Sequence, residues 1–381
     1  MSTLIVGASA AGLACAEALR RKGYTSALTL VGAETRLPYD RPPLSKQVLS
    51  GSWEPSAAQL RSSESLEGLD ATFVLGDPAV HLDVVERAVH TASGRVLKAD
   101  NIVLATGLRP RTLPGQPTLR TLDDALALRA RLLDCSRAVV VGDGVLGAEI
   151  AATASSMGVQ VTLAGPQQAP MELQLGPLVA AQLAGLHTSA GVSLRLGAAV
   201  TDVGSDGVRL ESGEVLPADV VVVAFGSTPA TDWLQDSGLT LGNGIICDSR
   251  LRAAEGIYAC GDVARWHHEA LGRMVRQENR TNATEAGVLV ASNILGADEA
   301  YVPVPYFWTD QFSAKIHVHG FVGPSASVVE GSLAEGRFVV RYHRDGVLTG
   351  VLGWNMPKQA RLHRADISCR ATAATSTPGA A

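Results

Sequence analysis

Two glycine-rich turns in this chain have the spacing that binds the pyrophosphate of a dinucleotide. The first runs from Gly7 to Gly12 ("GASAAG") and the second from Gly142 to Gly147 ("GDGVLG"). Each follows a short apolar run and precedes a stretch rich in small and apolar residues, which predicts a strand, a tight turn and a helix. In that geometry, backbone N–H groups and the positive end of the helix point at a phosphate. One such turn is a weak signal, but two in the same context indicate two dinucleotide sites.

The elements around the two turns repeat. We expect strands over 3–6 and 138–141, and helices that end near Gly23 and Gly158. Each unit then continues into a second strand ("ALTLVG" and "VQVTLAG") and closes with an apolar strand, a glycine, two residues and a proline ("NIVLATGLRP" and "VVVVAFGSTP"). Continuous apolar strands are typical of parallel sheets that are covered on both faces. The pattern predicts an α/β protein with two doubly wound dinucleotide-binding domains.

The remaining segments suggest how the domains are arranged. Thr121, followed by acidic residues, is a candidate N-cap for a helix after a Pro/Gly-rich link. The strand-like "GIYACGDVARW" follows the second unit and suits a return to the first. Alternating short strands then predict a small α+β domain with an antiparallel sheet. We expect a discontinuous first domain (1–108 and 226–299), a second domain (109–225), a C-terminal domain (300–366) and a disordered tail (367–381).

Composition excludes several classes of protein. The net charge of −5 and the absence of long basic runs do not favour a nucleic-acid partner. Apolar runs are of strand length, far below the roughly 20 residues of a membrane helix. A strand begins almost at residue 1, so we expect no signal peptide and a cytoplasmic location. The five cysteines form no CxxC pair and are interpreted as small buried residues in a reducing compartment.

Two dinucleotide sites in one chain indicate electron transfer between two cofactors. Glu34 lies 22 residues after Gly12, where an acid usually holds the adenosine ribose. A unit of this kind at the N-terminus most often holds FAD. The second unit then holds the nicotinamide nucleotide, which delivers a hydride to the flavin.

The motifs together resemble one family. From about residue 3 to 360 the chain is similar to the FAD-dependent, NAD(P)H-dependent ferredoxin reductases of oxygenase systems, the putidaredoxin reductase-like family. The glycine turns are shared by many flavoproteins, whereas "YDRPPLSK" and "FWTDQ" are more specific. Further carriers are "LATGLRPR", "LRTLDDA", "VGDGVLGAEIAAT", "CGDVARW", "TNATEAG" and "VLGWNMP". The architecture that this resemblance implies is like that of glutathione reductase.

The resemblance also implies cofactor contacts. For FAD these are Gly7, Ala11, Gly12 and Arg41, with Glu34 near the adenosine ribose, Val80 at adenine, Lys46 beside the flavin, Arg120 from the interdomain link and Asp262 at a ribityl hydroxyl. For the nicotinamide nucleotide they are Gly142, Gly144, Gly147 and Glu149. Further expected contacts are Ala8, Ser9, Ala105, Thr106, Gly107, Val145, Leu146, Gly226, Gly261, Glu278, Arg280, Thr281 and Trp308. No metal site is expected.

Lys46 and Glu149 are the two residues to which the resemblance gives a catalytic role, as a pair. A lysine is a compact point charge on a thin stem, and it can place positive charge near the flavin edge, which favours the anionic reduced ring. Glu149 would limit the cost of burying that charge. The alternative is an exposed lysine at the start of a helix. No cysteine lies between residues 16 and 134, so we expect no reactive thiol beside the flavin and direct transfer to an outside acceptor.

Three positions depart from the family pattern. Ser9 replaces the middle glycine of the first turn, and a small side chain can fit there. The run from Ala164 to Gln168 ("AGPQQ") has no acid for a ribose 2′-hydroxyl and no arginine for a 2′-phosphate, so NADH is favoured by family habit alone. Arg280 occupies a position where many relatives carry an aromatic or apolar residue. Its side chain either enters the active site or points to solvent.

Other candidates carry two interpretations each. Trp308 is either a core anchor or a residue near the flavin where the acceptor docks, and both can hold. Asp310 and Gln311 are either turn residues or part of the flavin edge. The adjacent His267 and His268 are interpreted as surface residues.

Asp143 in the second turn is assigned a local backbone role. The four arginines between 265 and 280 form either a docking face for an acidic ferredoxin or, as the more ordinary reading, a solvated basic surface. They are Arg265, Arg273, Arg276 and Arg280.

The predicted function is therefore that of an oxidoreductase. NAD(P)H reduces FAD, and single electrons pass to an iron–sulfur ferredoxin that feeds a monooxygenase or a Rieske-type oxygenase. Distance and orientation would account for most of the rate. The alternatives are an NADH-dependent flavoprotein oxidase or quinone reductase, and a redox-sensing FAD/NADH-binding protein like apoptosis-inducing factor. No nucleic acid or membrane is expected as a partner.

Overall fold

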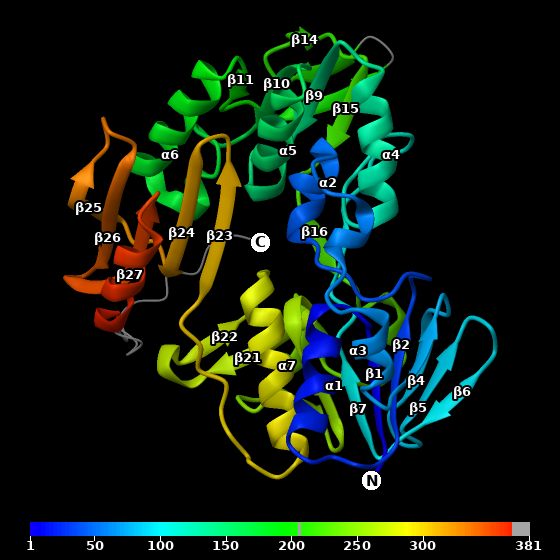
Figure 1. Cartoon of the computed structure of the whole chain (residues 1–381). Coiled ribbons are helices and arrows are strands. Elements are labelled where there is room, and N and C mark those ends of the chain that lie inside the picture. Colours follow the sequence, from blue (N-terminus) through cyan, green and yellow to red (C-terminus); the bar gives the residue numbers. More distant parts are fainter. Residues whose placement is uncertain (205–206, 368–381) are drawn as a thin grey trace.

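A computed structural model describes residues 1–204 and 207–367. Three sheets with their helices form most of the molecule, and the first two face each other across the middle of Figure 1. The third sheet lies to one side of both, and its first strand, β23, passes close to α5 and α7.

The first sheet contains the first glycine-rich turn. Its strand order is β19-β20-β7-β1-β2-β3, and β1, β2, β3, β7 and β20 run parallel. Because β20 lies beside β7, the chain returns to this sheet after it has built the second one. The strands are β1 (Thr3–Val6), β2 (Leu28–Gly32), β3 (Thr72–Leu75), β7 (Asn101–Leu104), β19 (Arg252–Ala254) and β20 (Ile257–Ala259).

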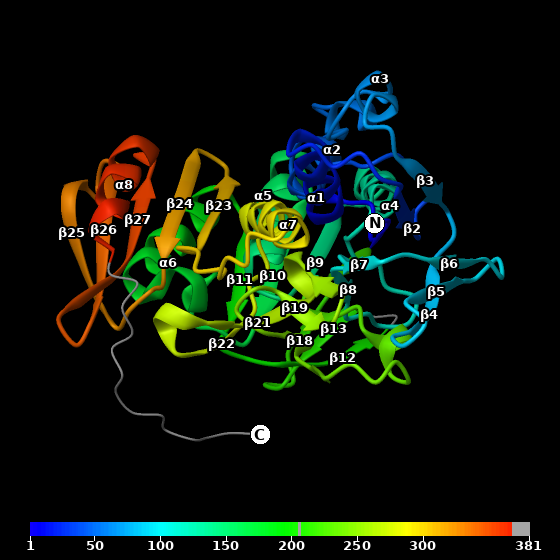
Figure 2. The same cartoon turned by 90° about the horizontal axis from the view of Figure 1, so that it is seen from below.

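Two helices, α1 (Ala10–Arg21) and α7 (Arg280–Ile294), lie side by side on this sheet (Figures 1 and 2). A Cβ atom added to Gly287 would lie 2.4 Å from the backbone oxygen of Ala11, so the close approach of the two helices requires glycine at that position. This packing holds the N-terminal ends of both helices near one another.

The second sheet has the order β11-β10-β9-β15, and all of its strands are parallel. Its strands are β9 (Arg137–Val141), β10 (Gln160–Gly165), β11 (Ser193–Leu196) and β15 (Val220–Val223). The helices are α4 (Leu122–Leu133), α5 (Val145–Ser156) and α6 (Glu172–Ser189). Gly176 interrupts α6 with a φ of 73°, and Tyr342 from the third sheet donates a hydrogen bond to the oxygen of Leu175 beside this kink, at 2.5 Å.

The third sheet is antiparallel, as expected from the alternating strands of the C-terminal part. Its order is β23-β24-β27-β26-β25. The elements are β23 (Tyr306–Gln311), β24 (Ala314–Gly320), β25 (Ser325–Ser332), β26 (Arg337–Arg344), β27 (Val347–Trp354) and α8 (Pro357–His363).

Smaller elements connect these layers. A two-stranded pair joins β8 (Leu108–Pro110) to β16 (Ser227–Pro229) where the chain crosses between the first two sheets. The others are β4 (Ala79–Asp83), β5 (Ala88–Thr91), β6 (Val96–Lys98), β12 (Val200–Gly204), β13 (Gly207–Leu210), β14 (Val215–Leu216), β17 (Leu241–Gly242), β18 (Gly244–Cys247), β21 (Ala264–His268), β22 (Arg273–Val275), α2 (Gln47–Ser50) and α3 (Ser63–Glu67). Short 3-10 helices include Pro42–Ser45 and Gly261–Val263.

The predicted α/β class with two doubly wound sheets and a C-terminal antiparallel sheet is confirmed. Thr121 caps α4 as expected: its side chain accepts from the N–H of Asp124, and the Asp124 carboxylate accepts from the N–H of Thr121. The domain boundaries stay a prediction, and all but the first residue of the expected tail (367–381) lies outside the described residues. Cys135 is partly exposed, so the expectation that the cysteines are buried is wrong for that residue.

Candidate active site

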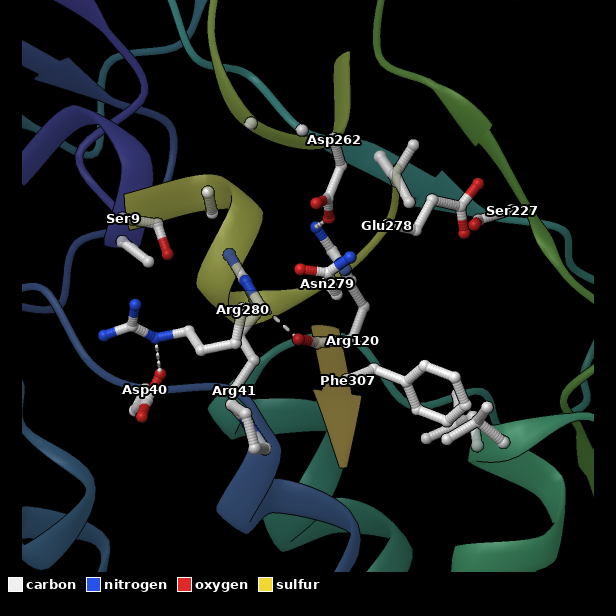
Figure 3. Close-up of a pocket in the computed structure, with 18 of the residues that line it drawn as sticks. Ser9, Asp40, Arg41, Arg120, Ser227, Asp262, Glu278, Asn279, Arg280 and Phe307 are labelled. Carbon is white, nitrogen blue, oxygen red and sulfur yellow. Dashed lines mark hydrogen bonds and ion pairs between the residues drawn. The ribbon is translucent and has the colours of Figure 1, made fainter. Parts of the chain in front are cut away.

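A cavity of about 600 Å³ opens where the three sheets meet. Its walls come from the starts of α1, α5 and α7, the segment 40–46, the link before α4, and β23 (Figure 3). The predicted site residues that line it are Ser9, Ala11, Arg41, Lys46, Ala105, Thr106, Gly107, Arg120, Val145, Leu146, Glu149, Gly261, Asp262, Glu278, Arg280 and Trp308.

The first glycine-rich turn lies at the edge of this cavity and has no space for side chains at its glycines. Gly7 has a φ of 117°, and a Cβ there would lie 2.2 Å from the oxygen of Ala105; a Cβ on Gly12 would lie 1.9 Å from the oxygen of Gly7. Ser9 is the N-cap of α1, and its side chain makes no capping hydrogen bond. The first N–H groups of α1 therefore have no side-chain cap from Ser9 and are available to an anion.

The second turn repeats this geometry. Gly142 has a φ of 118°, and a Cβ there would lie 2.3 Å from the oxygen of Ala224. A Cβ on Gly147 would lie 1.7 Å from the oxygen of Gly142. A Cβ added to Gly144, the N-cap of α5, would have no heavy atom of the described residues within 4 Å beyond its chain neighbours and the helix backbone. Two phosphate cradles of the same form therefore stand on neighbouring sheets.

Lys46 and Glu149 form a largely buried ion pair on the cavity wall. Lys46 Nζ lies 2.9 Å from Glu149 Oε2, and the two side chains are 11% and 7% exposed. Ser45 donates to the same oxygen at 2.5 Å, and Thr309 donates to Glu149 Oε1 at 2.7 Å. The alternative of an exposed lysine is wrong. One carboxylate thus joins three segments that are far apart in the sequence.

Arg41 connects the segment after β2 to the link before α4. It lies 2.7 Å from Glu34 Oε1 and donates to the oxygen of Arg120 at 2.5 Å. Tyr39 also donates to Glu34, and burial raises the pKa of the Tyr39 hydroxyl to about 12. Glu34 is therefore held behind Arg41 and does not line the cavity.

Asp262 and Arg120 come from opposite walls and point toward each other (Figure 3). Arg120 Nη2 lies 3.8 Å from Asp262 Oδ2, which is longer than a hydrogen bond. Burial raises the pKa of Asp262 to about 6, and the charge of Arg120 opposes this only in part. Burial also lowers the pKa of Arg120, with a further contribution from Arg41. The charges of Asp262 and Arg120 are therefore only partly compensated by other groups of the protein.

Arg280 points into the cavity rather than to solvent. Its Nε donates to Asp40 Oδ1 at 2.5 Å, as Figure 3 shows, and its Nη1 donates to Thr284 Oγ1. Arg280 is the first residue of α7, whose N-cap is Asn279. The structure thus places an ion pair on the cavity wall at the start of α7.

The aromatic residues of β23 form the wall opposite the turns. Phe307 and Trp308 line the cavity, and Trp308 stacks on Tyr306 with ring centroids 5.9 Å apart. Asp310 and Gln311 lie in the strand, so their interpretation as turn residues is wrong. Gln311 is buried, and its Oε1 accepts a hydrogen bond from His187 Nε2 at 2.7 Å, away from the cavity.

Ten predicted residues do not line the cavity. Most belong to the turns, whose glycines shape the backbone without facing the space. They are Gly7, Ala8, Gly12, Glu34, Val80, Gly142, Gly144, Gly147, Gly226 and Thr281. Val80 lies on β4 and is 49% exposed. The binding roles of all predicted residues stay predictions.

Sequence reasoning missed several lining residues. Asp40 and Ser45 stand inside the motif "YDRPPLSK", which was the available signal. Pro42 and Leu44 lie in the same motif, and Phe307 lies in "FWTDQ". Gln174, Ser227, Gln277 and Asn279 had no local signal. Cys260 also lines the cavity, but it is buried, and burial raises the pKa of its thiol to about 12. That thiol stays protonated at neutral pH and is a poor nucleophile.

The remaining candidates are structural. His268 is buried and 3.1 Å from the oxygen of Pro303, so the surface interpretation holds for His267 alone. Arg276 pairs with Glu278 at 2.6 Å, and Arg280 pairs with Asp40, so the four arginines do not form one free basic face. In residues 1–204 and 207–367 no group of three His, Cys, Asp or Glu residues could hold a metal. The described helices include none that could span a membrane.

Comparisons with known proteins find similar sequences over most of the chain. A family model described as pyridine nucleotide-disulphide oxidoreductase matches residues 1–287, and one described as reductase C-terminal matches residues 306–377. Rhodocoxin reductase of Rhodococcus erythropolis is 33% identical, with 94% of this chain and 87% of that protein covered. The ferredoxin–NAD(+) reductase subunit of a benzene 1,2-dioxygenase system from Pseudomonas putida is 32% identical, with 94% and 90% covered.

A solved structure is similar over the same length. The covalent complex of putidaredoxin reductase with putidaredoxin has a chain that superposes with a TM-score of 0.91 at 32% identity, over 97% of this chain and 93% of that one. The similarity therefore includes both dinucleotide units and the C-terminal sheet.

Proposed function

This chain belongs to the pyridine nucleotide-disulphide oxidoreductase family, and we propose that it is an NAD(P)H-dependent ferredoxin reductase of an oxygenase system. The observation that supports this most is that both phosphate cradles open toward one cavity. Ser9 and Ala11 from the first turn, and Val145 and Leu146 from the second, line the same space. Two dinucleotides held in this way would bring their reactive rings together.

The residues of the first unit fit FAD. Gly7 and Gly12 leave the turn bare, and the start of α1 supplies N–H groups for the pyrophosphate. Asp262 is a partly buried acid whose charge Arg120 compensates only in part, and it can exchange hydrogen bonds with a hydroxyl-rich chain. When bound, FAD supplies a ring that accepts a hydride and releases electrons one at a time. The second unit fits a nicotinamide nucleotide by the same geometry.

Lys46 and Glu149 would position charge between the two sites. Lys46 is fixed by Glu149, so its positive charge stays at the cavity wall where negative charge develops during reduction. Glu149 is held by three donors and cannot swing away without losing them. Phe307 and Trp308 close the opposite side and limit water. The chain thus provides orientation and electrostatics.

The electron acceptor that we propose is an iron–sulfur ferredoxin that binds transiently and feeds a monooxygenase or Rieske-type oxygenase. One relative named above is the ferredoxin–NAD(+) reductase subunit of a benzene 1,2-dioxygenase system, and the similar solved structure holds putidaredoxin reductase in a covalent complex with putidaredoxin. Trp308, partly exposed on the cavity rim, is the proposed exit. We also propose a cytoplasmic location, because the four described cysteines are free, which suits a reducing compartment.

Two experiments test the proposal in order. Purified protein should be yellow, and NADH should bleach its absorbance in a stopped-flow instrument. Cytochrome c should then be reduced rapidly only when a ferredoxin is added. Slow reduction with a long-lived charge-transfer complex would instead favour the redox-sensing alternative, and fast consumption of oxygen or quinone without ferredoxin would favour an oxidase or quinone reductase.

The pair itself is tested by Lys46→Met. We expect slower flavin reduction by NADH and a reduction potential lower by on the order of 30 mV, which corresponds to about 1.4 kcal/mol for a two-electron couple. The cause is the loss of positive charge at the cavity wall. Lys98→Met is the matched control, because Lys98 forms an exposed surface pair with Glu86 at 2.8 Å. Equal rates and potentials in the two variants would reject the role of Lys46.

A further inference from the structure

The end of β10 lacks the acid that commonly selects NADH. In many dinucleotide units, an acid after the second strand accepts a hydrogen bond from the 2′-hydroxyl of the adenosine ribose and repels a 2′-phosphate. Here β10 ends at Gly165, and Pro166 and Gln167 follow. Nothing in that run carries charge. The choice between NADH and NADPH must therefore be encoded elsewhere, or not at all.

Asp143 occupies the space that a side chain at position 165 would need. It is the second residue of the glycine-rich turn, directly after β9, which pairs with β10 in the sheet. A Cβ built on Gly165 would lie 2.3 Å from Asp143 Oδ2 and 2.4 Å from its Cγ. Such distances exclude a side chain at 165 while Asp143 is present. The carboxylate thus reaches the strand end from the turn.

The Asp143 carboxylate is buried without a cation beside it. Its two hydrogen-bond donors are the backbone N–H and the side-chain amide of Gln167, both at 2.7 Å and both neutral. Arg195, on the neighbouring strand β11, pairs with Glu214 at 2.9 Å. A carboxylate offers about four acceptor positions, so Gln167 leaves acceptor capacity free. In the described part of the chain its charge is therefore uncompensated.

We propose that Asp143 is the residue that selects NADH over NADPH in this chain. This rests on the proposed function, in which the second turn holds the nicotinamide nucleotide. The carboxylate provides a negative charge at the strand end that opposes a 2′-phosphate, and its free acceptor positions suit a 2′-hydroxyl. In this arrangement the acid lies in the turn and not at the strand end, and the absence of a side chain at Gly165 leaves space for it.

Asp143 also holds the loop between β10 and α6 in place. Gln167, which it orients, accepts a hydrogen bond from the N–H of Leu173 at 2.8 Å, and the N–H of Met171 donates to the backbone oxygen of Asp143 at 2.8 Å. A variant that only disturbed this loop would weaken the binding of NADH and NADPH to the same extent. The test must therefore change the charge of the side chain at position 143 while it keeps the size of that side chain. Its readout must be the ratio of the activities with NADPH and NADH.

The first variant is Asp143→Asn, which keeps the size of the side chain and can still accept from the N–H of Gln167. We expect kcat/KM for NADPH to rise by on the order of tenfold relative to that for NADH, since a nearby like charge is removed. The dissociation constants of NAD⁺ and NADP⁺ for the FAD-loaded protein, from calorimetry, should shift in the same direction. The melting temperature should stay unchanged. An unchanged coenzyme ratio would overturn the proposal.

A second pair of variants tests the exchange of positions. Gly165→Asp alone should impair binding of both coenzymes, because the new side chain meets Asp143. The double variant Asp143→Gly with Gly165→Asp removes that clash, returns the acid to the strand end, and should recover the preference for NADH. If the double variant folds but does not prefer NADH, the result would contradict the proposed role of a negative charge at the end of β10.

Glu172→Gln is the matched control. Glu172 is the other acid of this loop, and it accepts from the N–H of Gln168 at 3.0 Å. Its loss should leave the coenzyme ratio unchanged; a shift as large as that of Asp143→Asn would assign selection to the general acidity of the loop and overturn the proposal. Wild-type protein that uses NADPH better than NADH would sink this inference alone. Protein that binds neither nucleotide would sink the proposed function.

Discussion

Two carboxylates on the same cavity are held in opposite ways. Glu149 accepts hydrogen bonds from a lysine and two hydroxyl groups, so its negative charge is stabilised by groups of the protein itself. Asp262 has Arg120 as its nearest cation at 3.8 Å, and burial outweighs that attraction. The Glu149 carboxylate is therefore held in place on the cavity wall, whereas the Asp262 carboxylate can still accept a hydrogen bond from a bound group. Their different partners suit different roles toward a bound cofactor.

Asp262 predicts a pH dependence of stability for the cofactor-free protein. Its pKa of about 6 lies above the ordinary value of 3.8, so between these values the folded protein binds more protons than the unfolded chain. Stability therefore falls as pH rises through this window, by on the order of 2 to 3 kcal/mol. The stabilising contribution of Asp262 is fully present below pH 3.8 and is lost above about pH 6.

Melting temperatures of the cofactor-free wild type and of Asp262→Asn, measured across this pH range, check the prediction. The wild type should lose stability relative to the variant as pH rises, because asparagine does not titrate. Parallel curves for the two proteins would contradict it.

At the residue scale, sequence reasoning found the pair but not its supports. Lys46 and Glu149 are 103 positions apart, and only the resemblance to a family connected them. Ser45 and Thr309 complete the same carboxylate site from 104 and 160 positions away. No local pattern predicts such partners. The sequence around a serine or threonine in a strand or short helix is the same whether or not its hydroxyl group contacts a carboxylate. Asp143 was likewise assigned a backbone role, since the sequence does not show that it faces Gly165.

At the element scale, the strand–turn–helix units were readable because their chemistry is local. Gly7 and Gly142 need positive φ, and each precedes the helix whose start it shapes. The short pair β8–β16 and the small sheet β12–β14 were not foreseen. Their strands are two to five residues long and mix buried with exposed positions, so they show no clear alternation.

Helix α4 offers a prediction at this scale. Its capping box joins Thr121 and Asp124, and Arg120 precedes it on the cavity wall. Thr121→Ala removes the acceptor for the N–H of Asp124 and should cost about 1 kcal/mol of stability. The check is the melting midpoint of the cofactor-free protein. Ser62→Ala, at the cap of the exposed five-residue helix α3, is the comparison and should have a smaller effect; an equal or larger effect would contradict the role of α4.

At the scale of the whole molecule, one carboxylate ties three units together. Glu149 stands on α5, Ser45 and Lys46 belong to the segment after the first turn, and Thr309 lies on β23 of the C-terminal sheet. Figure 1 shows β23 passing beside α5 and reaching toward α7. The relative placement of the units is therefore coupled to the charge pair on the cavity wall.

Thr309→Val tests this coupling. Valine keeps the approximate volume but leaves Glu149 Oε1 without its donor. Gln311 Nε2 loses one acceptor, at 3.1 Å, and keeps Met171 Sδ as the other. Unpaired buried groups of this kind cost about 1 to 3 kcal/mol. We expect a lower melting temperature and slower flavin reduction in stopped-flow measurements.

The control for this variant is Thr349→Val on β27 of the same sheet, where the hydroxyl makes a long 3.4 Å contact with the oxygen of Tyr342. It should change the melting temperature little and the reduction rate not at all. A Thr309→Val protein that is reduced at the wild-type rate would show that the C-terminal sheet does not act on the pair.

The order in which the cavity wall is synthesised has a further consequence. The wall begins with Ser9 and ends with Trp308, and Thr309 follows directly. A ribosome that has translated 300 codons has made both glycine-rich turns but not the strand that closes the space between them. The space between the turns can therefore be closed only after β23 has been synthesised. We therefore expect the protein to retain FAD firmly only after β23 has packed against α5 and α7.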